Sequence, residues 1–132
     1  MASLTPSRMV TMTFSCTSES LLGARRDPSF GPVVACGTGG IETEAQEDVA
    51  LRVAPVSQAM ARDLISETRV GRILAGLRGQ PAADLDNLAR AIVALSRLMV
   101  EFPQIQEVDL NPVLLFPGQP GLLALDARIR VG

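Results

Sequence analysis

Three oxygen-bearing side chains near the end of the chain have the types and spacing of a metal site. Asp109 and Asn111 stand two positions apart in an apolar run, so on a β-strand both would point to one face. Asp126 lies in the next apolar run, which would pair beside the first. Such oxygens suit Mg²⁺, which keeps several waters and takes its remaining ligands from phosphates. The alternative is a row of solvated side chains on a half-exposed sheet.

A glycine-rich segment is the second candidate. Gly37, Gly39 and Gly40 fall within four residues, after an apolar run. Backbone amides in such a segment can cradle a phosphate or acyl group. A turn that binds no ligand accounts for the same glycines, and no Gly-Lys-Ser/Thr sequence follows to form a Walker loop.

Two adjacent arginines are the third candidate. Arg25 and Arg26, followed by Asp27, have the donors to clamp a phosphate. A solvated turn with a local ion pair of small energetic value is the alternative.

These residues must be positioned by an α+β fold, with an antiparallel sheet and helices packed on it. Apolar runs bounded by Gly and Pro predict strands, and the apolar stripe of three- and four-residue steps after Asp84 predicts a helix. Residues 41–55 fit either a short strand at 41–44 or a helical turn near 46–52. The expected strands are 20–25, 32–37, 106–115 and 122–129, and the expected helices are 57–68, 70–77 and 85–100.

Composition narrows the functional classes. The chain has 132 residues, 47% hydrophobic and 20% charged, with a net charge of −2, which predicts one globular domain. The weakly negative net charge does not predict a basic surface that would bind nucleic acid. No apolar run is long enough to predict a membrane span. Two cysteines without metal-ligand spacing indicate free thiols and a cytoplasmic protein, although a disulfide is the alternative. Histidine is absent, which excludes a histidine base, ligand or phosphohistidine within this chain.

Several of these motifs occur in the order found in one known family. The strings DPSFGPVVACGTGG (27–40), ETEAQEDVALRVAP (42–55) with its Glu44 and Asp48, RGQPAADLDNLARAIVALSRL (78–98), EVDLNPVLL (107–115) and ALDARI (124–129) resemble the ATP-grasp region of NDP-forming acyl-CoA synthetases. These include the ADP-forming acetyl-CoA synthetases. More distantly, the chain resembles the β subunit of succinyl-CoA synthetase. The similarity covers about residues 19–131.

The resemblance implies roles for the candidate residues. Asn111 and Asp126 match the family positions that bind the Mg²⁺ of ATP or ADP, and Asp109 matches an acidic position beside them. Gly37, Gly39 and Gly40 match a loop that faces the active site. Arg25 and Arg26 fall in the family's segment before the Phe-Gly-Pro string.

The resemblance also implies the domain organisation. Residues 1–18 are expected to be a loosely ordered entry segment, and 19–132 the carboxy-terminal subdomain of an ATP-grasp fold. In that fold the amino-terminal subdomain supplies a lysine and a phosphate-covering loop. All 12 basic residues here are arginines, so a missing amino-terminal subdomain or a CoA-binding subunit is the expected partner.

Two functional hypotheses follow. In the first, the chain is the Mg²⁺-nucleotide half of a ligase that converts an acid, CoA and ATP to acyl-CoA, ADP and phosphate. In the second, it is a truncated, non-catalytic paralogue that serves as an interaction module. An apolar patch left by the missing subdomain would favour association into a homo-oligomer.

Overall fold

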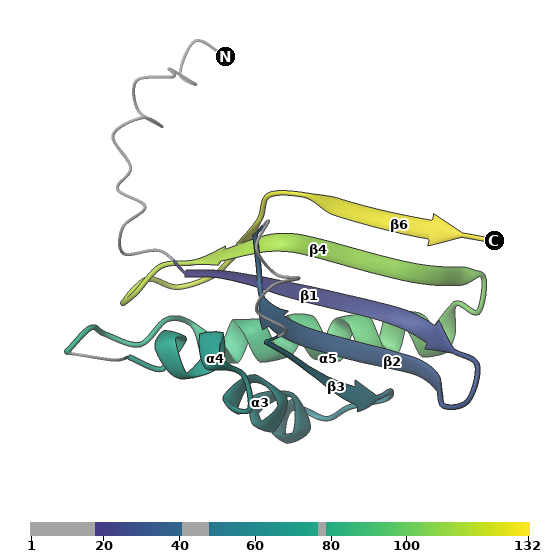
Figure 1. Cartoon of the computed structure of the whole chain (residues 1–132), viewed down its shortest axis with the longest axis horizontal. Coiled ribbons are helices and arrows are strands. Elements are labelled where there is room, and N and C mark those ends of the chain that lie inside the picture. Colours follow the sequence, from purple (N-terminus) through teal and green to yellow (C-terminus); the bar gives the residue numbers. More distant parts are fainter. Residues whose placement is uncertain (1–17, 41–47, 77–78) are drawn as a thin grey trace, which may run out of the picture.

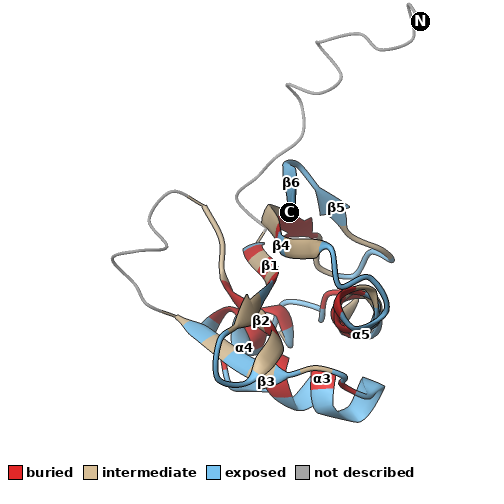
Figure 2. Cartoon of the chain, turned by 90° about the vertical axis from the view of Figure 1, so that its right-hand side faces the viewer, coloured by how far each residue is buried: buried red, intermediate tan, exposed pale blue. Residues whose placement is uncertain are grey.

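One antiparallel sheet with helices packed on one face makes up the described part of the protein (Figure 1). The computed structural model describes residues 18–40, 48–76 and 79–132. Figure 2 shows the helices of the described residues together on one side of the sheet, and none of these helices lies on the opposite, open face. The predicted α+β class and antiparallel pairing are confirmed. The proposed entry segment, residues 1–18, lies outside the described residues except for Ser18, which begins the first strand.

The first two strands form the predicted hairpin. β1 (Ser18–Asp27) pairs with β2 (Gly31–Thr38), so both strands are longer than the apolar runs suggested. The Asp27 carboxylate accepts hydrogen bonds from the amides of Ser29 (2.8 Å) and Phe30 (3.0 Å), which closes the turn. Chiefly because of these two bonds, the pKa of Asp27 lies below its ordinary value.

β3 (Val49–Val53) is the edge strand beside β2. The helical turn considered near 46–52 is therefore wrong, and the alternative strand at 41–44 lies outside the described residues. The alternating pattern explains the outcome. Ala50 pairs with Cys36 on the core side, whereas Val49, Leu51 and Val53 point to the open face and are 44–49% exposed.

In the described residues, three helices cover the other face. α3 (Gln58–Ser66) begins at Ser57, whose side chain caps the Met60 amide, and α4 (Arg69–Leu74) begins at Thr68, which caps Gly71. α5 (Leu85–Glu101) has Asp84 as its N-cap, as predicted. Within the described residues no helix is long and apolar enough to cross a membrane.

The last strands surround the predicted metal residues. β4 (Ile105–Leu115) pairs with β1 on one side, and on the other with β5 (Leu123–Ala124) and β6 (Ala127–Val131). The single strand predicted over 122–129 is therefore two strands, and Asp126 lies in the break between them. The register between β1 and β4 shifts beside Asn111 and Pro112. This irregularity agrees with the bulge that a proline in a central strand predicts.

The core lies between the sheet and the helices. β1, β2 and β4 direct alternate side chains into it, and α5 supplies its buried stripe. The free thiol of Cys36 is buried there, and burial raises its pKa to about 12. The largest fully buried apolar residues are Leu22, Leu64, Ile65, Leu88, Ile92, Met99 and Leu115.

Arg26 fastens the end of α5 to the sheet. Its guanidinium donates to the carbonyl oxygens of Met99 (2.7 Å), Phe102 (2.8 Å) and Ile105 (2.8 Å). The last four carbonyl groups of a helix have no partner within the helix, so a cation at the end of α5 can satisfy those of Met99 and Phe102. The alternation of β1 sends Arg26 toward the helices and its neighbour Arg25 to the open face.

The backbone of the glycine segment lies against β1. The Gly39 amide donates to the Glu19 carbonyl at 3.0 Å. A Cβ atom on Gly39 would stand 2.4 Å from the Ser20 carbonyl oxygen and 3.1 Å from Asn111 Oδ1. Only glycine permits this approach, so the contact accounts for Gly39 without a ligand.

Replacing Arg26 with methionine should lower the free energy of unfolding by about 2–4 kcal/mol, because three carbonyl oxygens lose a charged donor. Denaturant unfolding at pH 7 measures the change. Arg25→Met removes an arginine from the exposed side of the same strand and should cost less than about 0.5 kcal/mol. Equal losses in the two variants would contradict the role of Arg26.

Gly39→Ala should destabilise the protein by more than about 1 kcal/mol, because the added methyl group collides with backbone that cannot move freely. Gly23→Ala is the matched control, since a Cβ there meets its nearest described neighbour, the Val108 carbonyl oxygen, at 3.4 Å. Thermal unfolding of both variants tests the contact. A Gly39 variant as stable as the Gly23 variant would show that the approach is not required.

Candidate metal and phosphate site

Four segments that are distant in sequence meet at one end of the open sheet face. They are the start of β1, the glycine segment after β2, the irregular part of β4, and the break between β5 and β6. Their polar side chains are Glu19, Asn111 and Asp126. Asn111, Asp126 and the glycines were predicted from the sequence, whereas Glu19 was not among the predicted site residues.

Asn111 joins three of these segments. Its backbone amide donates to the Asp126 carbonyl oxygen at 3.2 Å, so the two residues stand side by side. Its side-chain Oδ1 accepts a hydrogen bond from the Gly40 amide at 2.9 Å. An amide oxygen has two lone pairs, so Oδ1 keeps one for a further partner while the Gly40 contact fixes its direction.

Asp126 supplies an accessible carboxylate beside Asn111. Its side chain is 58% exposed and forms an ion pair with Arg128, whose Nε lies 3.7 Å from Oδ2. An exposed ion pair at this distance contributes little to stability, so the oxygen atoms of the Asp126 carboxylate remain available to another cation.

The chemistry of this donor set fits Mg²⁺. Asn111 and Asp126 offer hard oxygen atoms from adjacent backbone segments, and the surroundings are open to water. Among residues 18–40, 48–76 and 79–132, no group of three histidine, cysteine or acidic side chains is arranged to hold a metal. A cation held by one carboxylate and one amide needs water and phosphate oxygens to complete its shell, which is the usual arrangement for Mg²⁺.

Glu19 and Gly40 form the rim of the same site. Gly40 has a φ of +93°, a conformation that favours glycine, and a Cβ there would stand 2.8 Å from Glu19 Oε1. The carboxylate of Glu19 therefore lies against the glycine backbone. Its position at the start of β1 gave no indication of this in the sequence, because the neighbour is contributed by a different strand.

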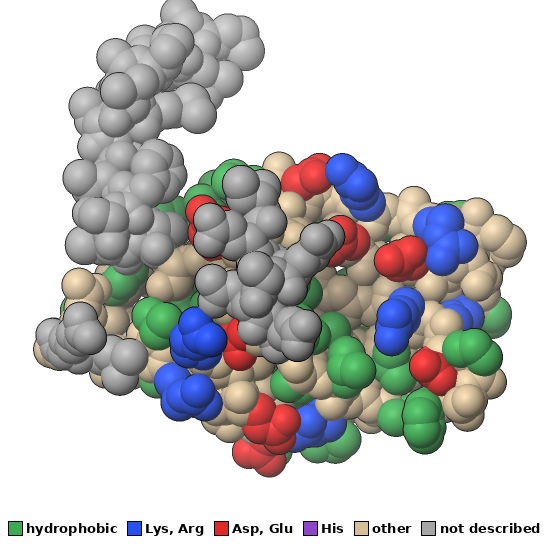
Figure 3. Space-filling view, viewed as in Figure 1, with side chains coloured by type: hydrophobic (Ala, Val, Ile, Leu, Met, Phe, Trp, Pro, Cys, Tyr) green, Lys and Arg blue, Asp and Glu red, His purple; other side chains and the backbone are tan. Residues whose placement is uncertain are grey.

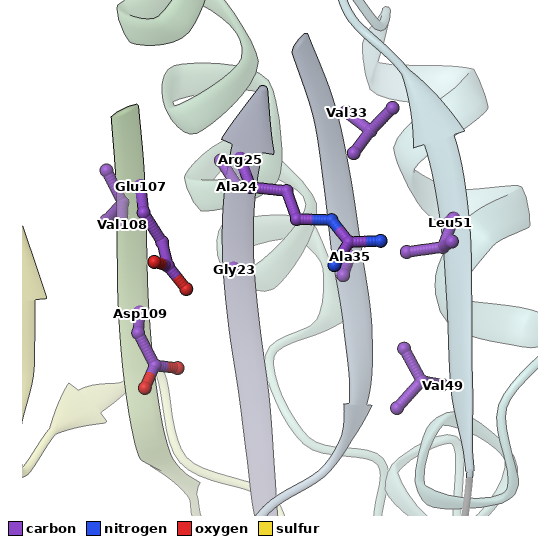
Figure 4. A pocket seen from close by; sticks show the side chains of 10 residues that line it. All are labelled: Gly23, Ala24, Arg25, Val33, Ala35, Val49, Leu51, Glu107, Val108 and Asp109. Atoms are coloured by element: carbon purple, nitrogen blue, oxygen red, sulfur yellow. The ribbon is translucent and has the colours of Figure 1, made fainter. Parts of the chain in front are cut away.

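Asp109 lies farther along the open face. It lines a hollow of about 280 Å³ whose floor includes Gly23 and Ala35. In Figure 4, Asp109 and Glu107 project from β4 toward β1, and the guanidinium of Arg25 extends over β2. Asp109 is paired in register with Arg128 of β6. The structure thus puts Asp109 on the same face as the site, next to a basic strand.

The charged residues occupy only part of the open face. Figure 3 shows acidic and basic side chains over β4 and β6, and hydrophobic side chains over β2 and β3. Glu107 forms an ion pair with Arg130 at 3.2 Å. The apolar part includes the exposed side chains of Val49, Leu51 and Val53.

The structure does not bring Arg25 and Arg26 together as one clamp. Arg25 is on the open face, whereas Arg26 points to the helices and donates to three carbonyl oxygens there. Both lie at the hairpin end of β1. Ser18 and Glu19 stand at the other end, roughly 20 Å away at about 3.3 Å per residue. A phosphate-binding role for either arginine stays a prediction.

Asp84 fixes the backbone of the loop that precedes β5 and Asp126. Its carboxylate accepts from the Gly121 amide at 2.6 Å, just before β5, and from both the side chain and the amide of Asn87. The bond from Gly121, followed by those from Asn87, holds the pKa of Asp84 below its ordinary value. One carboxylate therefore caps α5 and fixes the loop that leads to the metal residues.

Known proteins are similar to this chain in sequence and in fold. Residues 6–131 match the family model of the ATP-grasp domain. The chain is 39% identical over 114 residues to "Acetate--CoA ligase [ADP-forming] I" of Archaeoglobus fulgidus, covering 86% of this chain and 16% of that protein. It is 40% identical over 111 residues to "Acetate--CoA ligase [ADP-forming] I subunit beta" of Pyrococcus furiosus, covering 84% of this chain and 47% of the subunit.

A solved structure is also similar to this chain in fold and in sequence. It is the dinucleotide-forming acetyl-coenzyme A synthetase 1 of Ca. Korarchaeum cryptofilum, in complex with coenzyme A and Mg-AMPPCP. The TM-score is 0.81 at 39% identity, over 87% of this chain and 53% of that chain. This chain thus spans only a part, between about a sixth and a half, of the proteins that it matches. With a family model over nearly its whole length and a sheet of the same architecture, the chain belongs to the ATP-grasp domain family.

Proposed function

We propose that this chain is the Mg²⁺-nucleotide-binding half of an NDP-forming acid–CoA ligase that resembles acetyl-CoA synthetase. The observation that carries the proposal is the pairing of Asn111 with Asp126 beside the glycine segment. The Korarchaeum structure, which was solved with Mg-AMPPCP, supports ATP or ADP as the nucleotide. We extend the proposal to a cytoplasmic location, which the free thiol of Cys36 favours.

Each residue of the site has a distinct task in this proposal. The Asp126 carboxylate and Asn111 Oδ1 would hold Mg²⁺, which neutralises phosphate charge during transfer. The Gly40 amide keeps Asn111 Oδ1 turned toward the glycine segment. Asp109, two residues before Asn111, adds negative charge beside the cation and would orient its waters. Arg25 remains a candidate for contact with an anionic part of the substrate on the same face.

We further propose that catalysis needs a partner, either an ATP-grasp amino-terminal subdomain or a CoA-binding subunit. Two observations support this. The matched relatives include a β subunit about twice as long as the matched region. The open face also exposes Val49, Leu51 and Val53 beside its charged side chains. A non-catalytic interaction module is the alternative, and the same apolar surface, which would also favour homo-oligomers, is the observation in its favour.

Calorimetric titration of the full chain with Mg·ATP and Mg·ADP tests the proposal. We expect metal-dependent binding that weakens at least tenfold in the Asn111→Ala, Asp126→Ala double variant, which corresponds to about 1.4 kcal/mol or more. Omitting Mg²⁺ should have a similar effect on the unmodified chain.

The matched control removes one carboxylate and one amide elsewhere, as Asp63→Ala with Gln119→Ala, both of which are exposed. This variant should bind as the unmodified chain does. Absence of binding at millimolar nucleotide, or equal binding by the double variant, would refute nucleotide binding by this chain and leave the interaction module as the better reading.

A further inference from the structure

Asp48 is an acidic residue outside the candidate metal and phosphate site. It precedes β3, and its carboxylate makes three hydrogen bonds to two other segments. Oδ1 accepts from the Arg69 amide at 2.8 Å, and Oδ2 accepts from the Val70 amide at 3.1 Å and from Thr38 Oγ1 at 2.5 Å. One side chain therefore joins the start of α4 to the end of β2.

The bonds of Asp48 favour its charged form. Partial burial raises the pKa of Asp48, but the hydrogen bonds from Thr38, Arg69 and Val70 outweigh this effect, and the pKa lies below its ordinary value. The backbone makes the same connection, because the Thr38 amide donates to the Asp48 carbonyl oxygen at 2.9 Å. Gly37 permits this approach, since a Cβ there would stand 2.1 Å from that oxygen.

α4 is a firm anchor for these bonds. Val70 and Leu74 are 4% and 3% exposed and belong to the core. Thr68 caps the helix independently, as its hydroxyl accepts from the Gly71 amide at 2.9 Å and donates to the Ile65 carbonyl at 2.7 Å. Asp48 thus ties the end of β2 to a helix whose position the core already determines.

Two residues after Thr38, the chain reaches the metal site. Gly40 donates its amide to Asn111 Oδ1, and Gly39 donates to the Glu19 carbonyl. A small displacement of Thr38 would carry Gly39 and Gly40 with it, because Gly39 is the only residue between Thr38 and Gly40. The hydrogen bond from the Gly40 amide would then no longer orient Asn111 Oδ1.

We propose that Asp48, acting through Thr38, is a positioning residue that sets the Gly40 amide and thereby the orientation of Asn111 as a metal ligand. The metal part of this inference rests on the proposed function. The path runs from α4 through the Asp48 carboxylate, the Thr38 hydroxyl and the Gly40 amide to Asn111 Oδ1. Supporting shells of this kind commonly change metal affinity by tenfold or more when they are removed.

Thr38→Val tests the path, because it keeps the shape of the side chain and removes only the hydroxyl donor. We expect faster hydrogen exchange at the Gly40 amide, a changed resonance of the Asn111 side-chain amide, and Mg·ATP affinity reduced about five- to tenfold. Thr38→Ser restores the hydroxyl and should recover all three values.

Thr68→Val is the matched control, since it removes a cap from α4 and leaves Thr38 and Asp48 in place. It should lower stability without changing the Gly40 exchange rate or the affinity for Mg·ATP. If Thr68→Val and Thr38→Val weaken binding and speed Gly40 exchange equally, α4 as a whole controls the site and the specific role of the Thr38 hydroxyl is refuted. The path is also refuted if Thr38→Val leaves the Gly40 amide and the Asn111 resonance unchanged.

The two proposals fail in different ways. Should the unmodified chain not bind Mg·ATP at all, the proposed function fails, whereas the exchange and resonance measurements still decide whether Thr38 sets Gly40 and Asn111. Should Mg·ATP bind and depend on Asn111 but not on Thr38, the proposed function stands and the positioning role is overturned.

Discussion

The pairing of β1 with β4 is the interaction on which the rest of the structure depends. It joins residues from opposite ends of the chain, such as Ser20, whose hydroxyl donates to the carbonyl of Val113, 93 positions away. β1 then carries β2 and β3 on one side, and β4 carries β5 and β6 on the other. The segments of the candidate metal site reach their places through this pair, because Glu19 belongs to β1 and Asn111 to β4.

Strand alternation around that pair divides the side chains between two environments. Residues that face the helices form a dry core, and Arg26 enters this side only because three carbonyl oxygens receive its donors. Residues that face away form the surface with the hollow, the charged pairs and the exposed side chains of β3. The irregularity in β4 beside Asn111 breaks this alternation at the point where the site is built.

The glycine segment has a structural explanation that bears on function. Gly37 and Gly39 permit backbone approaches that a Cβ would block, and Gly40 adopts a positive φ. The amides of Gly39 and Gly40 donate to protein acceptors rather than standing ready for a phosphate. In this arrangement the segment acts on Asn111, and its direct contact with a ligand stays a prediction. Such support would matter if Asn111 binds a small cation, as proposed, since a small cation demands well-placed oxygen atoms.

The sequence by itself determined the fold class, the hairpin of β1 and β2, the capped helix α5 and the strand that carries Asn111, because local periodicity and capping residues report these features directly. It also singled out Asn111 and Asp126, through the order of motifs shared with a family. The tertiary structure decided what depends on register and on distant partners. It placed Arg25 and Arg26 on opposite faces, split the predicted strand around Asp126, formed β3 where a helical turn was considered, and brought Glu19 and Asp48 to the glycine segment. No local pattern encodes these contacts, since each joins side chains or backbone groups from strands that meet only when the sheet assembles.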